Sequence, residues 1–141
     1  ALNNNNLVLK AKYDRMQAEE VRWETYNADD GDDYEALIVS YGTMSRVCRT
    51  AIDTMQADGL KVGMLRPQTL FPFPEQAVYD AANRESCRIV FSVEMSMGHV
   101  IEDVQRSIQG RKPVQWYGKC GGEVPTPEEI VEVVTNALKA Q

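Results

Sequence analysis

Four short hydrophobic runs alternate with helical stretches along this chain of 141 residues. The runs are Ala36–Ser40, Val62–Leu65, Ile89–Val93 and Val114–Tyr117, and a loop marked by glycine or proline follows each one. Strands that alternate with helices are typical of an α/β fold with a mostly parallel sheet covered by helices. In such a sheet the loops that follow the strands share one edge, where open α/β folds usually bind ligands.

Helices are expected after all four runs, because apolar side chains recur there with helical spacing. The first should end at Gly59 and the third at Gly110, since glycine commonly closes a helix. The last should begin with a capping box of Thr126 and Glu129, with Pro127 in its first turn. The side chains expected to face the core are Met44, Val47, Cys48, Ala51, Ile52 and Met55; Ala77, Val78 and Ala81 after Pro74; Val100, Val104 and Ile108; and Ile130, Val133, Val134, Ala137 and Leu138.

The residues ahead of the first run have a pattern of their own. Leu9, Tyr13 and Met16 are spaced by four and three residues, which predicts a helix over about residues 6–20. Val21–Tyr26 then alternates with a period of two. This alternation predicts a strand at the edge of the sheet, antiparallel to the others.

An acidic stretch with four aspartates between residues 29 and 33 follows this strand and indicates a solvated linker. Calcium binding is the sharper interpretation, but no glutamate follows at the spacing that an EF-hand loop needs. We therefore divide the chain into residues 1–33, a linker helix and candidate edge strand from a preceding domain, and residues 34–141, an α/β domain. The chain starts with Ala1 rather than Met, and we expect it to be a piece of a longer protein.

Composition narrows the class of protein. The net charge is −6, which argues against nucleic acid as a partner because phosphate binding needs clustered lysine and arginine. No apolar run is long enough to cross a membrane, and no signal peptide is visible. Cys48, Cys87 and Cys120 are odd in number and form no C-x-x-C pair. This favours a reducing cytoplasm and denies the chain an iron–sulfur cluster of its own.

Several residues on the expected loops are candidates for chemistry. Gly42 and Gly98 each precede a helix, so their backbone N–H groups either offer an anion site or simply belong to tight turns. Glu94 ends a buried strand and needs a partner there. It is either a general base or cofactor contact, or a structural carboxylate tied to Arg66, His99 or backbone amides. His99 is the only histidine, which favours a cap, surface or interface role over a triad or zinc site.

Apolar residues also gather on these loops, and two interpretations stay open for them. They form an exposed patch that implies a partner, or they pack into the core. The residues concerned are Leu70, Phe71, Phe73, Met95, Met97, Trp116 and Tyr117. Cys48 lies on the apolar face of its expected helix, where core packing is favoured over a reactive thiol.

The residues alone thus assemble no catalytic set and no metal site. We expect ligand or interface contacts on the loop edge instead. The residues expected to make them are Tyr41, Gly42, Thr43, Arg66, Glu94, Met97, Gly98 and His99.

Four longer sequence motifs identify the chain more specifically than the spacing of its apolar residues does. They occur in the order Val39–Thr43, Arg66–Pro74, Val93–Gly98 with Glu102–Val104, and Tyr117–Gly122 with Pro125–Ile130. Together they closely resemble the C-terminal part of the alpha subunit of 2-oxoacid:ferredoxin oxidoreductases, and most of all the 2-ketoisovalerate and 2-oxoglutarate types. The resemblance covers about residues 7–140 of the chain.

The resemblance implies a fold like the C-terminal domain of transketolase, a three-layer α/β/α sandwich on a five-stranded mixed sheet. It also implies the reaction of the whole enzyme. That enzyme decarboxylates a 2-oxoacid on thiamine diphosphate with Mg²⁺, passes electrons through iron–sulfur clusters to ferredoxin, and forms an acyl-CoA.

In this family thiamine diphosphate lies between other domains, and the clusters lie on other subunits or domains. The implied role of this chain is therefore non-catalytic. It would pack against thiamine-binding and iron–sulfur subunits of an oligomeric enzyme and meet ferredoxin only indirectly. Cys120 is not interpreted as a cluster ligand, and its role stays open.

Two other functions stay open beside this one. The first is a small-molecule binding domain that holds CoA or another anion at Gly42 and Gly98. The second is the C-terminal domain of a transketolase or 2-oxoacid dehydrogenase component that does not use ferredoxin. The strings Phe71–Pro74 and Glu94–Gly98 favour the ferredoxin group.

Overall fold

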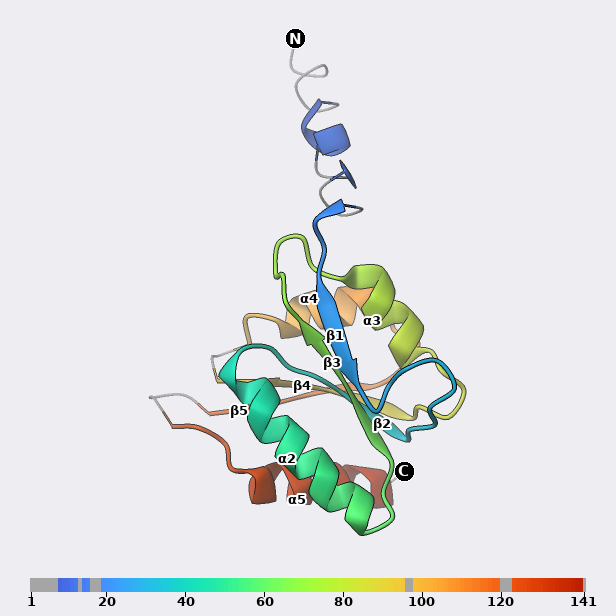
Figure 1. Ribbon diagram of the computed structural model, residues 1–141, viewed down its shortest axis with the longest axis vertical. Coiled ribbons are helices and arrows are strands. Elements are labelled where there is room, and N and C mark those ends of the chain that lie inside the picture. The colour runs from blue at the N-terminus through green and yellow to red at the C-terminus, as the bar shows by residue number, and fades with distance from the viewer. Residues whose placement is uncertain (1–7, 13, 16–18, 96–97, 120–122, 141) are drawn as a thin grey trace.

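Five strands form one sheet at the centre of the computed structural model. They are β1 (Trp23–Tyr26), β2 (Ala36–Val39), β3 (Val62–Pro67), β4 (Ile89–Glu94) and β5 (Val114–Gly118). Their order across the sheet is β1-β3-β2-β4-β5 (Figure 1). Strand β1 is antiparallel to β3, and the other neighbouring strands are parallel. The structure describes residues 8–12, 14–15, 19–95, 98–119 and 123–140.

The four hydrophobic runs are therefore all strands, within two residues of the expected bounds. The antiparallel edge strand predicted over Val21–Tyr26 is confirmed in shorter form as β1. The mostly parallel five-stranded sheet with one antiparallel strand is confirmed as well.

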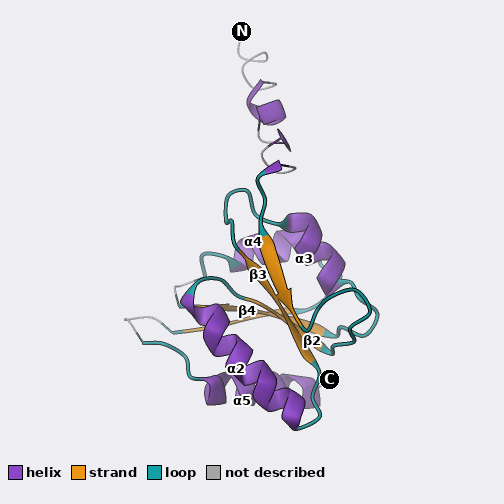
Figure 2. Ribbon diagram, in the orientation of Figure 1, coloured by secondary structure: helices purple, strands orange, loops and turns teal. Residues whose placement is uncertain are grey.

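Helices cover both faces of the sheet and make the predicted three layers (Figure 2). Helices α2 (Thr43–Ala57) and α5 (Pro127–Lys139) share one face, and α3 (Glu75–Ala82) and α4 (Ile101–Ile108) share the other. Each face buries its own apolar cluster between helices and strands.

Neighbouring side chains of each central strand point to opposite layers. In β2, Ile38 joins the cluster under α2 and α5, whereas Leu37 and Val39 join the cluster under α3 and α4. Because both faces are covered, such strands are hydrophobic without interruption. This is why the runs could be recognised in the sequence.

The helix boundaries follow local sequence signals with one difference. Thr126 and Glu129 form the expected capping box at the start of α5. Gly59 follows α2 with a positive φ of 86°, in the role predicted for it. Gly110 follows α4 in the same position, with a φ of 74°, but Gln109 ahead of it also adopts the left-handed conformation, with a φ of 59°.

The segment ahead of β1 extends away from the sheet (Figure 1). Residues 8–12 and 14–15 are helical, in agreement with the predicted helix, and Leu9 is exposed. Tyr13 and Met16, which also carried that prediction, lie outside the described residues. The domain boundary at residue 33 stays a prediction, although β1 belongs to the same sheet. Among the described helices, none has both the length and the hydrophobicity to span a bilayer.

Candidate functional site at the carboxyl edge

The loops that follow β2, β3, β4 and β5 meet at one edge of the sheet, together with the start of β1. We call it the carboxyl edge. The chain leaves β2 toward β3 on one side and leaves β4 toward β5 on the other, so the connections diverge between β2 and β4. Open α/β sheets usually bind ligands at such a switch point. Here Ser40 crosses the gap, and its buried hydroxyl donates to the Val93 carbonyl at 3.0 Å.

The first loop at this point is a tight turn into α2. Gly42 has a φ of 63°, which other residues rarely adopt, and its carbonyl accepts a hydrogen bond from the Ser45 hydroxyl at 2.6 Å. Tyr41 packs against the α3 and α4 cluster, and Thr43 is exposed. The glycine is thus explained by the turn, whether or not an anion binds there.

Glu94 is the central residue of the edge. Its side chain is 1% exposed and accepts four hydrogen bonds. Oε1 accepts from the Val100 amide at 2.8 Å, and Oε2 accepts from the Ile101 amide at 3.2 Å. Oε2 also accepts from Trp116 Nε1 at 3.1 Å and from the Ser92 hydroxyl at 3.4 Å. The carboxylate therefore caps the amino end of α4 from a neighbouring strand, where the helix dipole favours negative charge.

The predicted partners of Glu94 are thus only partly correct. Backbone amides bind it, but the structure shows no bond from Arg66 or His99 to Glu94 among the described residues. Arg66 reaches across the sheet to β1 instead, with its Nη1 3.1 Å from Glu24 Oε2. His99 is exposed, and Gly98 has a φ of 85°. Met97 lies outside the described residues.

A second carboxylate organises the far end of the edge. Glu129 accepts hydrogen bonds from Lys119 Nζ at 2.7 Å and from the Tyr117 hydroxyl at 3.1 Å. The bond from Lys119 lowers the pKa of Glu129 and raises the pKa of Lys119. Burial, and then the bond to Glu129, raise the pKa of Tyr117. This network ties the end of β5 to the start of α5.

Close packing leaves no room for a side chain at Gly118, the last residue of β5. An added Cβ would stand 2.4 Å from the Glu94 carbonyl oxygen and 2.8 Å from the Trp116 ring. Real Cβ atoms do not approach backbone atoms this closely. Glycine at this position thus lets the indole of Trp116 reach the Glu94 carboxylate.

Apolar loop residues divide between the two interpretations that the sequence left open. Phe73 is buried among α3 and α4, as core packing requires. Leu70, Phe71 and Met95 are exposed, as a partner surface requires. Trp116 and Tyr117 are partly buried, and they donate hydrogen bonds to Glu94 and Glu129. The apolar residues around them in the sequence gave no sign of these hydrogen bonds.

The described cysteines belong to the core. Cys48, on the inner face of α2, is fully buried, and burial raises the pKa of its thiol to about 12. Burial also raises the pKa of Cys87. Both are free thiols with little thiolate at neutral pH, so core packing of Cys48 is confirmed. Cys120 lies outside the described residues.

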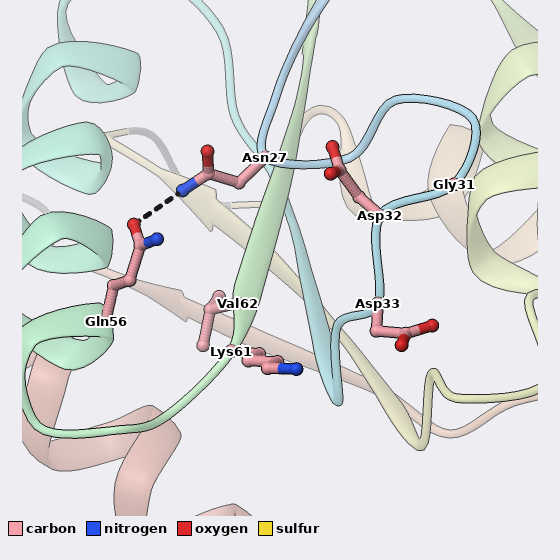
Figure 3. A pocket seen from close by; sticks show the side chains of 7 residues that line it. All are labelled: Asn27, Gly31, Asp32, Asp33, Gln56, Lys61 and Val62. Atoms are coloured by element: carbon pink, nitrogen blue, oxygen red, sulfur yellow. Dashed lines mark hydrogen bonds between the residues drawn. The ribbon is translucent and has the colours of Figure 1, made fainter.

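A polar hollow of 280 Å³ lies at the opposite edge, where the parallel strands begin (Figure 3). Asn27 Nδ2 donates to Gln56 Oε1 at 3.1 Å on one side of it, and Asp32 and Asp33 line the other. Among the described residues, no three histidine, cysteine or acidic side chains converge as metal ligands would. Sequence reasoning missed this hollow because its lining comes from four separate segments.

Comparison with known proteins identifies the family. Residues 34–130 match the sequence model of pyruvate:ferredoxin oxidoreductase core domain II. The chain belongs to this family. Within it, the chain is 40% identical over 129 residues to the ketoisovalerate oxidoreductase subunit VorB of Methanothermobacter thermautotrophicus. That match covers 92% of this chain and 35% of the relative.

A second relative points to the same group of enzymes. This core domain II is 36% identical over 103 residues to the 2-oxoglutarate synthase subunit KorA of Methanothermobacter marburgensis, which covers 73% of this chain and 27% of the relative. The chain thus spans between about a quarter and a third of the length of the curated relatives it matches.

Solved structures share the fold of this core domain II. A 2-oxoglutarate:ferredoxin oxidoreductase from Magnetococcus marinus, solved with 2-oxoglutarate, coenzyme A and succinyl-CoA bound, matches 96% of this chain and 23% of its own, with a TM-score of 0.77 and 24% identity. A split-gene transketolase described as an inactive beta4 tetramer matches 82% of this chain and 41% of its own, with a TM-score of 0.63 and 18% identity. At these identities the likeness shows the fold, which agrees with the predicted transketolase-like sandwich.

Proposed function

We propose that this chain is a non-catalytic assembly domain of a 2-oxoacid:ferredoxin oxidoreductase that uses thiamine diphosphate. The whole enzyme would decarboxylate a 2-oxoacid oxidatively, form an acyl-CoA and reduce ferredoxin. The ketoisovalerate type is supported by the 40% identity to a ketoisovalerate oxidoreductase subunit.

One observation carries the non-catalytic part of the proposal. Among the described residues, Glu94 is the buried charged side chain, and helix α4, Trp116 and Ser92 already occupy both of its oxygens. A general base must lie within reach of its substrate, and the Glu94 side chain is 1% exposed. Glu94 therefore holds the fold together at the place where an enzyme would put its reactive group.

The described part of this chain offers no ligand set for an iron–sulfur cluster. Iron–sulfur clusters need several converging thiolates, and among the described residues no three histidine, cysteine or acidic side chains converge. We assign thiamine diphosphate, Mg²⁺ and the iron–sulfur clusters to other domains and subunits of the enzyme.

The partners in this proposal are the thiamine-binding and iron–sulfur subunits of one oligomeric, cytoplasmic enzyme, with ferredoxin reached only through them. The chain would contact them, or CoA, through its loops. The proposed contact residues are Tyr41, Gly42, Thr43, Arg66, Met97, Gly98 and His99, and the buried Glu94 would support their loops from below. The net charge of −6 opposes nucleic acid as a partner.

The two other functions have less support. The transketolase structures are 16–18% identical and show the fold alone. Gly42 and Gly98 have the positive φ of tight turns, which accounts for glycine at both positions without an anion. The comparisons favour the ferredoxin-dependent enzyme over both alternatives.

The experiment that tests the proposal purifies the full-length gene product with whatever subunits accompany it. With thiamine diphosphate, Mg²⁺, CoA and 2-ketoisovalerate, the assembly should reduce methyl viologen faster than with 2-oxoglutarate. The 141-residue chain alone should give no reduction. Turnover by that chain alone would contradict the assembly role, and an inactive assembly would contradict the oxidoreductase.

A further inference from the structure

We infer that the carboxyl edge is the surface on which another domain of the same oxidoreductase polypeptide packs, with an apolar face against Trp23, Leu70, Phe71, Met95 and Val124. The inference rests on the proposed function, because it takes the partner from the whole enzyme. It goes further in naming the surface, the side chains and the occupant.

Exposed apolar side chains concentrate at this one edge. Trp23 is 44% exposed, Phe71 70% and Met95 40%, and Leu70 and Val124 are 42% exposed each. They lie at the start of β1 and on the loops after β3, β4 and β5. Among the described residues, the only other large exposed hydrophobics are Val8 and Leu9, in the segment ahead of β1. Large apolar groups gathered on one face indicate an interaction site.

The loops that present these side chains are held in place by the domain itself. Two residues after Phe71, the Phe73 side chain is buried in the core. Met95 follows Glu94, whose carboxylate is fixed by four donors, and Val124 precedes the capping box of α5. The apolar side chains are thus presented by anchored backbone, which lowers the entropy lost on docking.

The occupant follows from the path of the chain. The Gln68 amide donates to the Arg22 carbonyl at 2.9 Å, and the Arg22 amide donates to Thr69 Oγ1 at 3.0 Å. The segment ahead of β1 therefore joins the domain beside Leu70 and Phe71 (Figure 1). The relatives have about two thirds of their length outside the matched region. A domain joined through this short segment is held at high local concentration next to the patch.

Positive charge beside the apolar patch predicts a second feature of the surface that docks on it. A hollow of 140 Å³ beside β1 has three arginines in its lining, Arg46, Arg49 and Arg66, and one carboxylate, Glu24. Nε of Arg66 is buried and has no hydrogen-bond partner among the described residues, although Nη1 binds Glu24. A carboxylate at the rim of the docked face would complement these guanidinium groups.

The test uses the full-length enzyme with its subunits and the photo-crosslinking substitution Phe71→p-benzoylphenylalanine. After irradiation, mass spectrometry should find crosslinks from position 71 to a peptide of the same polypeptide outside the 141 residues. The matched control Lys61→p-benzoylphenylalanine, at the amino edge of the sheet, should give none to that peptide. Crosslinks only to another subunit or to a second copy of this chain would overturn the assigned occupant, and so would the absence of crosslinks.

A second measurement reports the energy of docking. Phe71→Ala should lower the thermal unfolding midpoint of the full-length enzyme by about 5 °C, as loss of a buried phenyl group does. If Phe71 stays in solvent, the shift should be under about 1 °C, as at other surface positions. Lys61→Ala is the control and should cause no shift.

Viologen reduction on the same preparation separates the two hypotheses. An active enzyme with neither crosslink nor shift overturns the docking surface alone. An inactive preparation with the expected crosslink supports docking and overturns the proposed function.

Discussion

Two glutamates cap the amino ends of two helices, one from within its own helix and one from a strand. Glu129 sits in the first turn of α5 and completes a capping box with Thr126, three residues away. Glu94 belongs to β4 and reaches the first amides of α4 across a loop. The first contact is local and partly in solvent, and the second is fully buried.

The difference concerns what each carboxylate does for the fold. A local cap stabilises its own helix and costs little when it is lost. A buried carboxylate that satisfies donors from a helix, a strand and an indole links three elements, and its loss leaves all those donors without a partner. The carboxyl edge should therefore depend far more on Glu94 than on Glu129.

The largest effect is expected for Glu94→Ala. The variant leaves the Val100 and Ile101 amides and Trp116 Nε1 without their acceptor, and unsatisfied buried donors cost about 1–3 kcal/mol each. We expect the free energy of unfolding, measured with urea, to fall by about 3–5 kcal/mol. Glu94→Gln keeps one acceptor oxygen and should lose less. A loss below about 1 kcal/mol for Glu94→Ala would break the comparison.

Gly118→Ala tests whether the close packing of β5 against Glu94 and Trp116 can accommodate a methyl group. The new methyl group would overlap the Glu94 carbonyl and the Trp116 ring. Overpacking of this kind should lower the free energy of unfolding by about 1–3 kcal/mol. Gly110→Ala, where the Cβ would meet open space but φ is 74°, is the control for backbone strain and should cost about 1 kcal/mol. Equal losses would show that Gly118 has no special role.

Thr126→Ala removes the other half of the local cap. The Glu129 amide would lose its bond to Thr126 Oγ1, which is 3.2 Å long. Loss of an N-cap of this kind costs about 1 kcal/mol, which a urea titration resolves. A loss as large as that of Glu94→Ala would contradict the distinction between the two caps.

The smallest effect is expected for the pH dependence of Glu129. Its pKa is lowered in the folded protein, chiefly by the bond from Lys119, so its contribution to stability is present above the ordinary glutamate pKa. The contribution is lost as the pH falls through the lowered pKa. The difference in unfolding midpoint between the native chain and Glu129→Gln should therefore shrink on acidification. Lys119→Met should weaken this dependence, and an unchanged difference would contradict it.

Local signals in the sequence predicted most of the fold. The hydrophobic runs, the capping box at Thr126 and the glycine at residue 59 all act through neighbours in the chain, so their roles could be read directly. Gly110 follows α4 as Gly59 follows α2, but the left-handed conformation of Gln109 ahead of it was not predicted, because that conformation usually requires glycine. No local pattern marks such an exception.

The site was less predictable than the fold. The position of Glu94 at the end of a strand showed that it needed a partner, but three kinds of partner fitted equally well. Only the packed structure shows that the α4 amides and Trp116 take that role, and that Arg66 turns to Glu24. Similarly, Phe71 and Phe73 have the same apolar character in the sequence, yet one is exposed and the other buried.

By itself the sequence determined the α/β class, the strands and helices and, through its motifs, the family to which the chain belongs. These depend on periodicity and short-range contacts, which any segment carries with it. The tertiary structure decided which groups meet at the carboxyl edge and which apolar side chains of that edge remain exposed. Those contacts join residues far apart in the chain, and their partners are chosen by the register of the sheet and the packing of the layers above it.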